Sequence, residues 1–225
     1  PLRKTPYEES SATFERVSPS VSLAMDVHQM IEMDTINSML MYLNVSEGFK
    51  SGGFSTGNET FDPEVLVSTE FGIKMDAFDS SLRLNLAIFD ASYRDIQLLV
   101  AEDVGGGNTI VVTRNAGEAS TRGAEVELTW WATPKLQFGL NANYINAKFI
   151  EYEDELVNPA TNLTSGTIDR SGEDFFHVPD SGGSLNVSYF QTLDVGELAY
   201  SLTAVYRGEM YVGFDTESAK SEYDD

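Results

Sequence analysis

The sequence predicts an all-β protein built as an antiparallel meander of about eight strands. Three observations support this: eight segments alternate between apolar and polar residues, their connections alternate between short and long, and one strand face carries no charge. The expected strands are 17–25, 38–47, 64–75, 81–97, 109–131, 135–150, 183–191 and 197–212. No segment has a convincing helical period, and 26–37 is expected to be a short helical turn or a linker.

The connections between these strands differ systematically in length. Short turns are expected at 76–80, 132–134 and 192–196, and long polar loops at 50–62, 101–108 and 151–182. Such a meander has one plain end and one elaborated end, as in outer-membrane barrels with short periplasmic turns and long extracellular loops. A soluble sandwich more often has Greek-key connections.

The alternation gives the strands two faces of opposite character. One face carries no charge, although 22% of the chain is charged, and only Thr69 on it is neither aliphatic nor aromatic. This face consists of every second residue in 21–25, 39–45, 65–73, 82–88, 124–130, 136–144, 185–189 and 198–206. The opposite face is small and polar, with the charged residues Glu70, Lys74, Arg83, Glu125, Glu127 and Arg207.

An uncharged face suits contact with lipid, because Lys or Arg near the bilayer midplane costs a barrel about 2–4 kcal/mol. The sequence therefore predicts part of a large transmembrane β-barrel of the outer-membrane type. The six charged residues are expected to face its lumen. A two-layer soluble sandwich shows the same alternation and remains the alternative.

Aromatic residues are expected near both ends of the strands. Trp130 and Trp131 lie beside the turn at 132–134, and Phe138 follows it. Tyrosines are expected at the far strand ends, at Tyr144, Tyr189, Tyr206 and Tyr211. Amphipathic rings at both ends are typical of the interfacial girdles of membrane barrels. Packing of a soluble core near hairpin ends would place them equally well.

Composition excludes several classes of partner and site. The net charge of −22 argues against nucleic acid, which calls for a basic surface. The absence of cysteine excludes disulfides and thiolate metal sites. No apolar run is long enough for a transmembrane helix. Nothing near Pro1 resembles an export signal, so the chain is expected either to stay unexported or to be an internal piece of a longer one.

Catalytic and cofactor signals are weak, and no catalytic residue, cofactor or metal site is predicted. The glycines at 105–107 lack the Lys-Ser/Thr of a phosphate loop and are expected at a hairpin tip. His28 and His177 are far apart, although His177 could contact iron or haem from a long loop. The acidic residues between Glu151 and Glu155 lack a calcium-loop pattern and suit a solvated loop or a cation-bridged contact with lipopolysaccharide.

The longest loop, 151–182, is the predicted place of ligand recognition. It combines charge with aromatic side chains, and its candidate ligand-binding residues are Tyr152, Arg170, Phe175, Phe176 and His177. Aromatic surface beside an arginine offers stacking area and an anchor for anionic groups. The alternative is that Phe175 and Phe176 only pack against a neighbouring loop.

Several short motifs in order resemble the barrel domain of TonB-dependent outer-membrane receptors. They include Gly-Phe-Lys-Ser-Gly-Gly-Phe at 48–54, Phe-Asp-Pro-Glu at 61–64 and Glu-x-Gly-x-Lys at 70–74. Asn-Ala-Gly-Glu-Ala at 115–119 and Gly-Ala-Glu-Val-Glu at 123–127 follow. Their order and spacing across 43–149 are specific, and 178–212 continues the same style.

The resemblance implies a barrel of about 22 strands whose lumen holds an N-terminal plug. It implies an outer-membrane location and uptake of a scarce solute, most simply a ferric siderophore or similar iron complex. Its implied partners are the TonB energy-coupling complex, through the plug, and outer-membrane lipid and lipopolysaccharide. Residues 1–225 are then expected to be a partial barrel domain without plug or terminal strands. A surface-exposed soluble β-domain with a carbohydrate-binding or adhesive role is the alternative.

Overall fold

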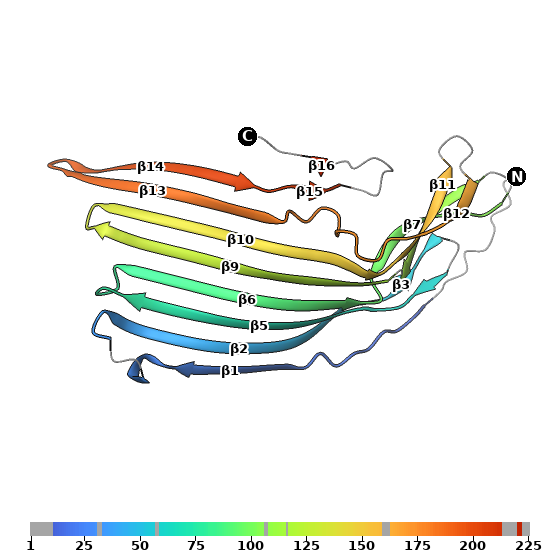
Figure 1. Cartoon of the computed structure of the whole chain (residues 1–225), viewed down its shortest axis with the longest axis horizontal. Helices are drawn as coiled ribbons and strands as arrows, with labels where there is room; N and C mark the ends of the chain where they lie inside the picture. The colour runs from blue at the N-terminus through green and yellow to red at the C-terminus, as the bar shows by residue number, and fades with distance from the viewer. Residues whose placement is uncertain are drawn as a thin grey trace, which may run out of the picture.

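A computed structural model describes residues 11–30, 33–56, 59–105, 108–115, 117–158, 163–212 and 220–221. Eight antiparallel strands form one curved sheet (Figure 1), which confirms the predicted meander. In order across the sheet they are β1 (Ser20–Asp26), β2 (Ile36–Lys50), β5 (Glu64–Ala77), β6 (Leu82–Arg94), β9 (Glu118–Thr133), β10 (Leu136–Glu151), β13 (Ser181–Leu193) and β14 (Gly196–Arg207). β1 and β14 are the two edges, so the sheet is an open wall.

The two ends of the sheet differ as expected. Short turns join the strands at one end, and the 3-10 helix η1 (His28–Met30) lies between β1 and β2 there. Short hairpins gather at the other end (Figure 1). They are formed by β3 (Gly53–Phe54) with β4 (Thr60–Phe61), β7 (Gln97–Asp103) with β8 (Thr109–Asn115), and β11 (Glu153–Asn158) with β12 (Leu163–Asp169). Among the described residues, no helix is long and apolar enough to cross a bilayer.

Some predicted strand boundaries were wrong. The segment 109–131 is two strands, β8 and β9, and the predicted loop 101–108 begins too early, because β7 continues to Asp103 and the connection follows it. The break falls at Gly117, whose φ is +151° and whose added Cβ would lie 2.0 Å from the Glu151 carbonyl oxygen. Both strands alternate with the same period, so the alternation does not reveal this glycine turn.

Three other boundaries also differ from the sequence prediction. The predicted strand 81–97 ends earlier, at Arg94, because Asp95 has a left-handed backbone conformation. The predicted strand 197–212 is also shorter, because β14 ends at Arg207. The short strand β15 (Met210–Tyr211) follows it and pairs with β16 (Lys220–Ser221). The expected loop 151–182 contains the β11–β12 hairpin. Gly105, at φ +85°, occupies the β7–β8 tip as expected, whereas the predicted positions Gly106, Gly107 and 159–162 lie outside the described residues.

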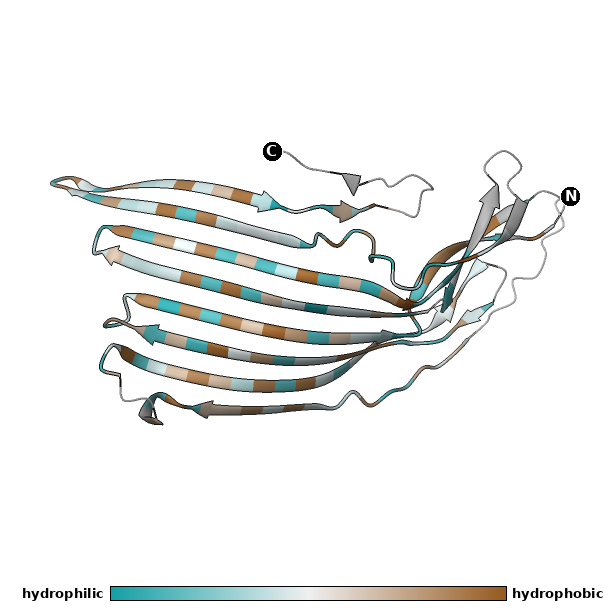
Figure 2. Cartoon of the chain, in the orientation of Figure 1, coloured by the Kyte–Doolittle hydropathy of each residue, from teal (hydrophilic) through white to brown (hydrophobic). Residues whose placement is uncertain are grey.

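Strand register shows that the two predicted faces are continuous across the sheet. Directly paired residues of antiparallel strands share a face. Leu86 pairs with Val126, which pairs with Ala142, whereas Glu127 pairs with Asn85 and Asn141. Every predicted uncharged position falls on the first face, here called the apolar face, and all six predicted charged residues fall on the other, the polar face. Figure 2 shows the resulting alternation along each strand.

The character of the two faces changes towards the hairpin end of β6, β9 and β10. There the apolar face carries charge, at Asp90, Arg94, Arg122 and Lys148. The opposite face becomes apolar and buried, with Ala91, Ala119, Ala147 and Phe149 at most 8% exposed. The sheet therefore has its own small core at the hairpin end, which continues through Ile96, Leu98 and Tyr152.

Aromatic rings mark both ends of the apolar face. At the short-turn end Trp130 stacks on Phe138 with 5.6 Å between ring centroids, and Tyr189 lies 6.4 Å from Tyr200. Tyr189 was expected at the strand end far from the short turns. Because β13 runs towards the short turns, Tyr189 pairs with Leu136, the first residue of β10, and therefore lies near those turns. Tyr144 and Tyr206 lie towards the hairpin end and are more than half exposed.

Candidate functional site

The polar face carries a hydrogen-bonded wall on β2, β5, β6 and β9. The Tyr42 hydroxyl donates to Glu70 over 2.7 Å, and the Lys74 ammonium lies 5.6 Å from the centroid of the Tyr42 ring. These residues line a shallow hollow of about 150 Å³, together with Asn85, Leu86, Ala87, Glu125 and Glu127. The hollow offers three carboxylates against one ammonium, so it suits a cationic or hydrogen-bond-donating group.

Four of the six predicted charged residues therefore line this hollow, and Arg83 and Arg207 do not. The Asn85 side-chain amide donates to Glu127 over 3.1 Å, which fixes one of the carboxylates. Arg83 lies nearer the short turns and forms an ion pair with Asp76 at 2.8 Å. Arg207 lies on β14, three strands away from Glu125 in the sheet order.

A second candidate site is the packed cluster at the hairpin end. Phe149 stacks on Tyr152 at 4.9 Å and on Phe175 at 4.8 Å between ring centroids, and Phe175 stacks on Phe176 at 5.4 Å. Backbone bonds hold the segment after β12 against β10: the Phe175 amide donates to the Ala147 carbonyl, and the Phe149 amide donates to the Glu173 carbonyl.

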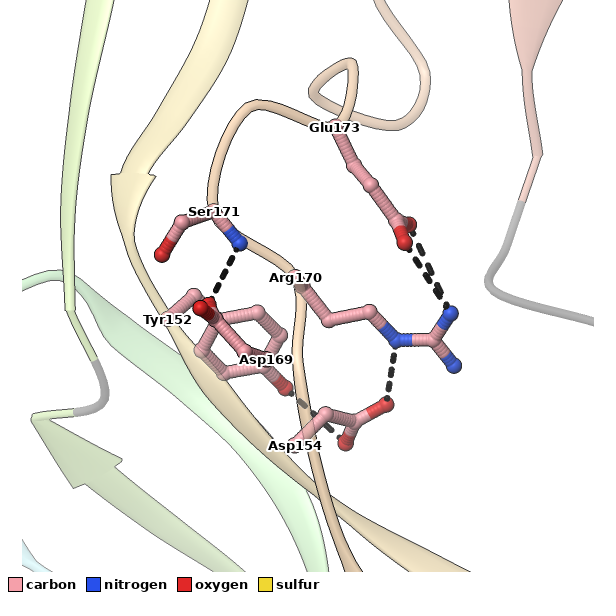
Figure 3. Close-up of polar contacts among 6 residues, drawn as sticks. All are labelled: Tyr152, Asp154, Asp169, Arg170, Ser171 and Glu173. Atoms are coloured by element: carbon pink, nitrogen blue, oxygen red, sulfur yellow. Dashed lines mark hydrogen bonds and ion pairs between the residues drawn. The ribbon is translucent and has the colours of Figure 1, made fainter.

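Arg170 connects β11 with the segment after β12 through two ion pairs (Figure 3). Its Nε lies 3.4 Å from an Asp154 oxygen and its Nη1 lies 3.3 Å from a Glu173 oxygen, while its side chain is only 10% exposed. The Tyr152 hydroxyl donates to the other Asp154 oxygen over 3.2 Å. Burial, followed by the negative charge of Asp154, raises the pKa of the Tyr152 phenol well above its usual value, so this hydroxyl stays a donor.

The five predicted ligand-loop residues thus lie together, but most of them face a packed interior. Tyr152 and Arg170 are buried, and Phe175 and Phe176 are partly buried. His177 is exposed at φ +63°, and its amide donates to the Tyr211 carbonyl over 2.6 Å. Within the described part of the chain, no three side chains of metal-binding type lie close enough together to hold an ion.

Sequence reasoning missed the exposed apolar side of the β7–β8 hairpin. Leu99 is 76% exposed and Val111 is 59% exposed, and the register puts both on one side of the hairpin. Val104 at the tip is also exposed. Exposed apolar surface next to polar loops is where an amphipathic solute finds contact area. The alternation in 97–103 and 109–115 indicates this apolar side when the two segments are interpreted as the strands of one hairpin.

Comparison with known proteins relates the chain to one family. The family model described as TonB dependent receptor-like, beta-barrel matches residues 3–224. Among curated proteins, the metal-pseudopaline receptor CntO of Pseudomonas aeruginosa, from strains UCBPP-PA14 and PAO1, is 26% identical over 171 residues. That alignment covers 73% of this chain and 23% of CntO, so the chain spans about a quarter of this relative.

Solved structures share the fold over most of this chain. The siderophore receptor PiuA from Acinetobacter baumannii has a TM-score of 0.62 at 19% identity, covering 85% of this chain and 26% of PiuA. The ferric yersiniabactin uptake receptor FyuA from Yersinia pestis has a TM-score of 0.59 at 20% identity, covering 88% and 27%. The RagAB peptide transporter has a TM-score of 0.60 at 13% identity, covering 85% and 28%.

Proposed function

We propose a transport function from one premise: this chain belongs to the family of TonB-dependent receptor-like β-barrels, whose model matches residues 3–224. It is accordingly part of an outer-membrane barrel. The whole protein acts as a receptor for energy-coupled uptake of a scarce solute, and residues 1–225 supply a portion of the barrel wall and its loops.

The observation that carries this proposal is the pair of opposite faces. An uncharged stretch of one face runs through eight neighbouring strands, and polar residues alternate with it on the other face. A soluble sandwich would need a second layer over the apolar face. Among the described residues, the other four sheets have two strands each, and Figure 1 shows three of them gathered at one end of the main sheet and β15–β16 following the end of β14. Lipid is the cover that we propose for an apolar surface of this extent.

In this proposal the polar face lines the lumen. Glu70, Lys74, Arg83, Glu125, Glu127 and Arg207 meet water and the N-terminal plug, and the plug connects the receptor to the TonB energy-coupling complex. Lumen side chains can be polar because water satisfies them, whereas the same residues on the lipid face would destabilise the barrel. No residue of this wall is assigned a catalytic role.

The proposed solute is a ferric siderophore or a similar metal complex. The support comes from the curated relatives named as metal-pseudopaline receptors, at 26% identity. Fold similarity alone does not select a solute, because a peptide transporter resembles the chain as closely in shape as a siderophore receptor does. The β7–β8 hairpin offers exposed apolar contact surface for such a ligand, at Leu99, Val104 and Val111.

The test uses the full-length receptor in cells that lack the native gene. Deleting 156–174, the simplest removal of the ligand loop, would also remove Arg170 and Glu173 from the buried ion pairs. A sharper variant replaces 157–165 with Asn-Gly, because Leu156 pairs with Gly166 and a two-residue turn closes that pair. A matched variant replaces 104–108 with Asn-Gly between the paired Asp103 and Thr109.

We expect uptake of radiolabelled ferric siderophore to require TonB and to fall about tenfold in the 157–165 variant, as loss of about 1.4 kcal/mol of binding implies. Outer-membrane abundance should stay at the wild-type level. Loss only in the 104–108 variant would move recognition to β7–β8. Normal uptake by both variants would contradict a ligand-binding role for these loops, and uptake independent of TonB would contradict the proposed function.

A further inference from the structure

A hydrogen-bonded junction joins the chain at Asp62 to the base of the β7–β8 hairpin. The Asn115 Oδ1 accepts from the Asp62 amide over 2.6 Å, and the Asn115 Nδ2 donates to the Asp62 carbonyl over 2.9 Å. The same Nδ2 donates to the carbonyl of the left-handed Asp95, just before β7, over 2.8 Å. One side-chain amide thus binds both backbone groups of a residue that lies 53 positions away in the sequence.

Gln97, directly opposite Asn115 in the hairpin, makes the second half of the junction. Its Nε2 donates to the Ser51 carbonyl over 3.0 Å and to the Asp62 carbonyl over 3.1 Å, and its backbone amide donates to Glu64 over 3.0 Å. The junction therefore holds the chain both before β3 and after β4. Because these strands have two residues each, and a hairpin this short is not stable alone in water, the junction is what orders β3–β4.

A second contact between the two hairpins lies along the edge of β8 that faces away from β7. The Thr113 amide donates to the Ser55 Oγ over 2.6 Å, and the Thr56 hydroxyl donates to the Val111 carbonyl over 3.0 Å. An edge strand exposes backbone groups of both kinds, and two hydroxyls bind one of each here. Thr113 is the direct partner of Leu99. This contact therefore holds the backbone that carries the exposed apolar side of the β7–β8 hairpin.

We infer that the β3–β4 and β7–β8 hairpins, here called the hairpin pair, move as one unit, and that Asn115 positions the exposed apolar side of this unit for ligand. Leu98 packs the opposite side of β7 into the hairpin-end core, but apolar packing has no preferred direction. Hydrogen bonds are directional, so the junction sets the orientation of the hairpin. It brings together three short motifs of the sequence, at 48–54, 61–64 and 115–119. The ligand role rests on the proposed function, whereas the coupling of the two hairpins does not.

Hydrogen exchange of the full-length receptor in detergent micelles tests the coupling. Asn115→Asp keeps the acceptor for the Asp62 amide, removes both donated bonds and places a carboxylate against two carbonyls. We expect amide exchange to rise about tenfold in both hairpins, as loss of two ordinary hydrogen bonds implies. Asn108→Asp is the matched control, because it adds the same charge to the same hairpin while its amide donates within its own turn, to Gly105. It should change exchange less than about twofold.

Three results of this experiment would overturn the inference. Two of them are a rise confined to one of the hairpins and no rise in either. The third is an equal rise in the β11–β12 hairpin, because Asn115 would then stabilise the whole hairpin end. If Asn115→Asp does not assemble, Gln97→Glu removes the donor to the Ser51 and Asp62 carbonyls at the same size and should give the same pattern.

Uptake of the radiolabelled ferric siderophore tests the positioning role. Asn115→Asp and Leu99→Ser should each raise the half-saturating concentration about fivefold and leave the maximal rate unchanged, whereas lost receptor would lower the maximal rate. The double variant should be no worse than either, because both changes remove the same ligand contact. Effects that multiply would overturn the positioning role. Coupled exchange without any ferric siderophore uptake would retain the hairpin pair and reject the ligand role together with the proposed solute.

Discussion

The short-turn half and the hairpin half of β6, β9 and β10 carry the same alternation with opposite polarity. In the short-turn half Leu86 and Val126 lie on the apolar face, with Glu125 and Glu127 behind them. In the hairpin half the charged Arg122 takes the place of the apolar residues. Strand periodicity shows only that two faces differ. The position at which the polarity reverses shows where along these strands the charged residues move to the other face.

The two halves of these strands also differ in how their apolar side chains are covered, and therefore in what stabilises them. In the short-turn half, the apolar side chains remain exposed on the isolated chain; Leu86 is 40% exposed and Ile88 is 58% exposed. In the hairpin half, Phe149 is 1% exposed and is covered by the chain's own segments. In the proposed barrel, lipid covers and stabilises the first half, whereas the second half is stabilised by its own tertiary packing.

Phe149→Ala should give the largest effect if the hairpin half has a core of its own. We expect a loss of about 3–5 kcal/mol, because truncation leaves a cavity among stacked rings. Hydrogen exchange of the β7–β8 and β11–β12 hairpins in the full-length receptor measures it. Phe138→Ala, on the same strand but on the apolar face, is the control; lipid can fill its space, so its cost should be smaller. Equal costs would mean that the hairpin half is not a separate packed region.

Val126→Arg tests the other half of the comparison. It places a cation on the apolar face and should destabilise the barrel by about 2–4 kcal/mol if Val126 lies near the midplane. Glu125→Gln, the adjacent residue on the polar face, should leave assembly intact. Urea unfolding of receptors reconstituted in vesicles gives both values. A larger effect for Glu125→Gln would mean that the lipid contacts the face assigned to the lumen.

The sequence alone predicted which residues lie on each face of the sheet, because alternation with a period of two residues is a local signal. Val126 and Glu125 can be assigned to opposite faces without knowing what either of them meets. The same locality explains the wrong boundary at Gly117: the strands on both sides alternate, and the positive φ of this glycine leaves no mark in that pattern.

The hairpin-end core could not be predicted, because its contacts are distant in sequence. Ile96 and Leu98 belong to the same buried cluster as Phe149, about fifty residues further along the chain, and no local pattern links them. Arg170 was predicted to anchor anionic ligand groups because it lies in a long loop among aromatic residues. Its burial follows from two carboxylates, Asp154 and Glu173, that folding brings to it.

Tyr152→Phe should give the smallest effect and sharpens the description of the hairpin half. It removes one hydrogen bond to Asp154 while keeping the ring stacked on Phe149, so we expect a loss of about 0.5–1.5 kcal/mol in hairpin protection. Tyr144→Phe, at an exposed position on the apolar face, should change hairpin protection by less than that. A loss as large as that of Phe149→Ala would mean that the hydroxyl, and not the stacked rings, holds the cluster together.

The stability that the Tyr152 hydroxyl contributes depends on pH, and burial of the phenol determines the sign of this dependence. The pKa of Tyr152 is raised in the folded hairpin end, so the neutral phenol contributes stability that is fully present below the ordinary tyrosine pKa. That contribution is lost as pH rises from about 10 towards the folded value, because the unfolded tyrosine ionises first. Wild-type hairpin protection should therefore fall over this alkaline range more steeply than that of Tyr152→Phe. Parallel pH profiles for the two proteins would show that the Tyr152 hydroxyl is already in water, and the hairpin half would then be packed less tightly than its stacked rings indicate.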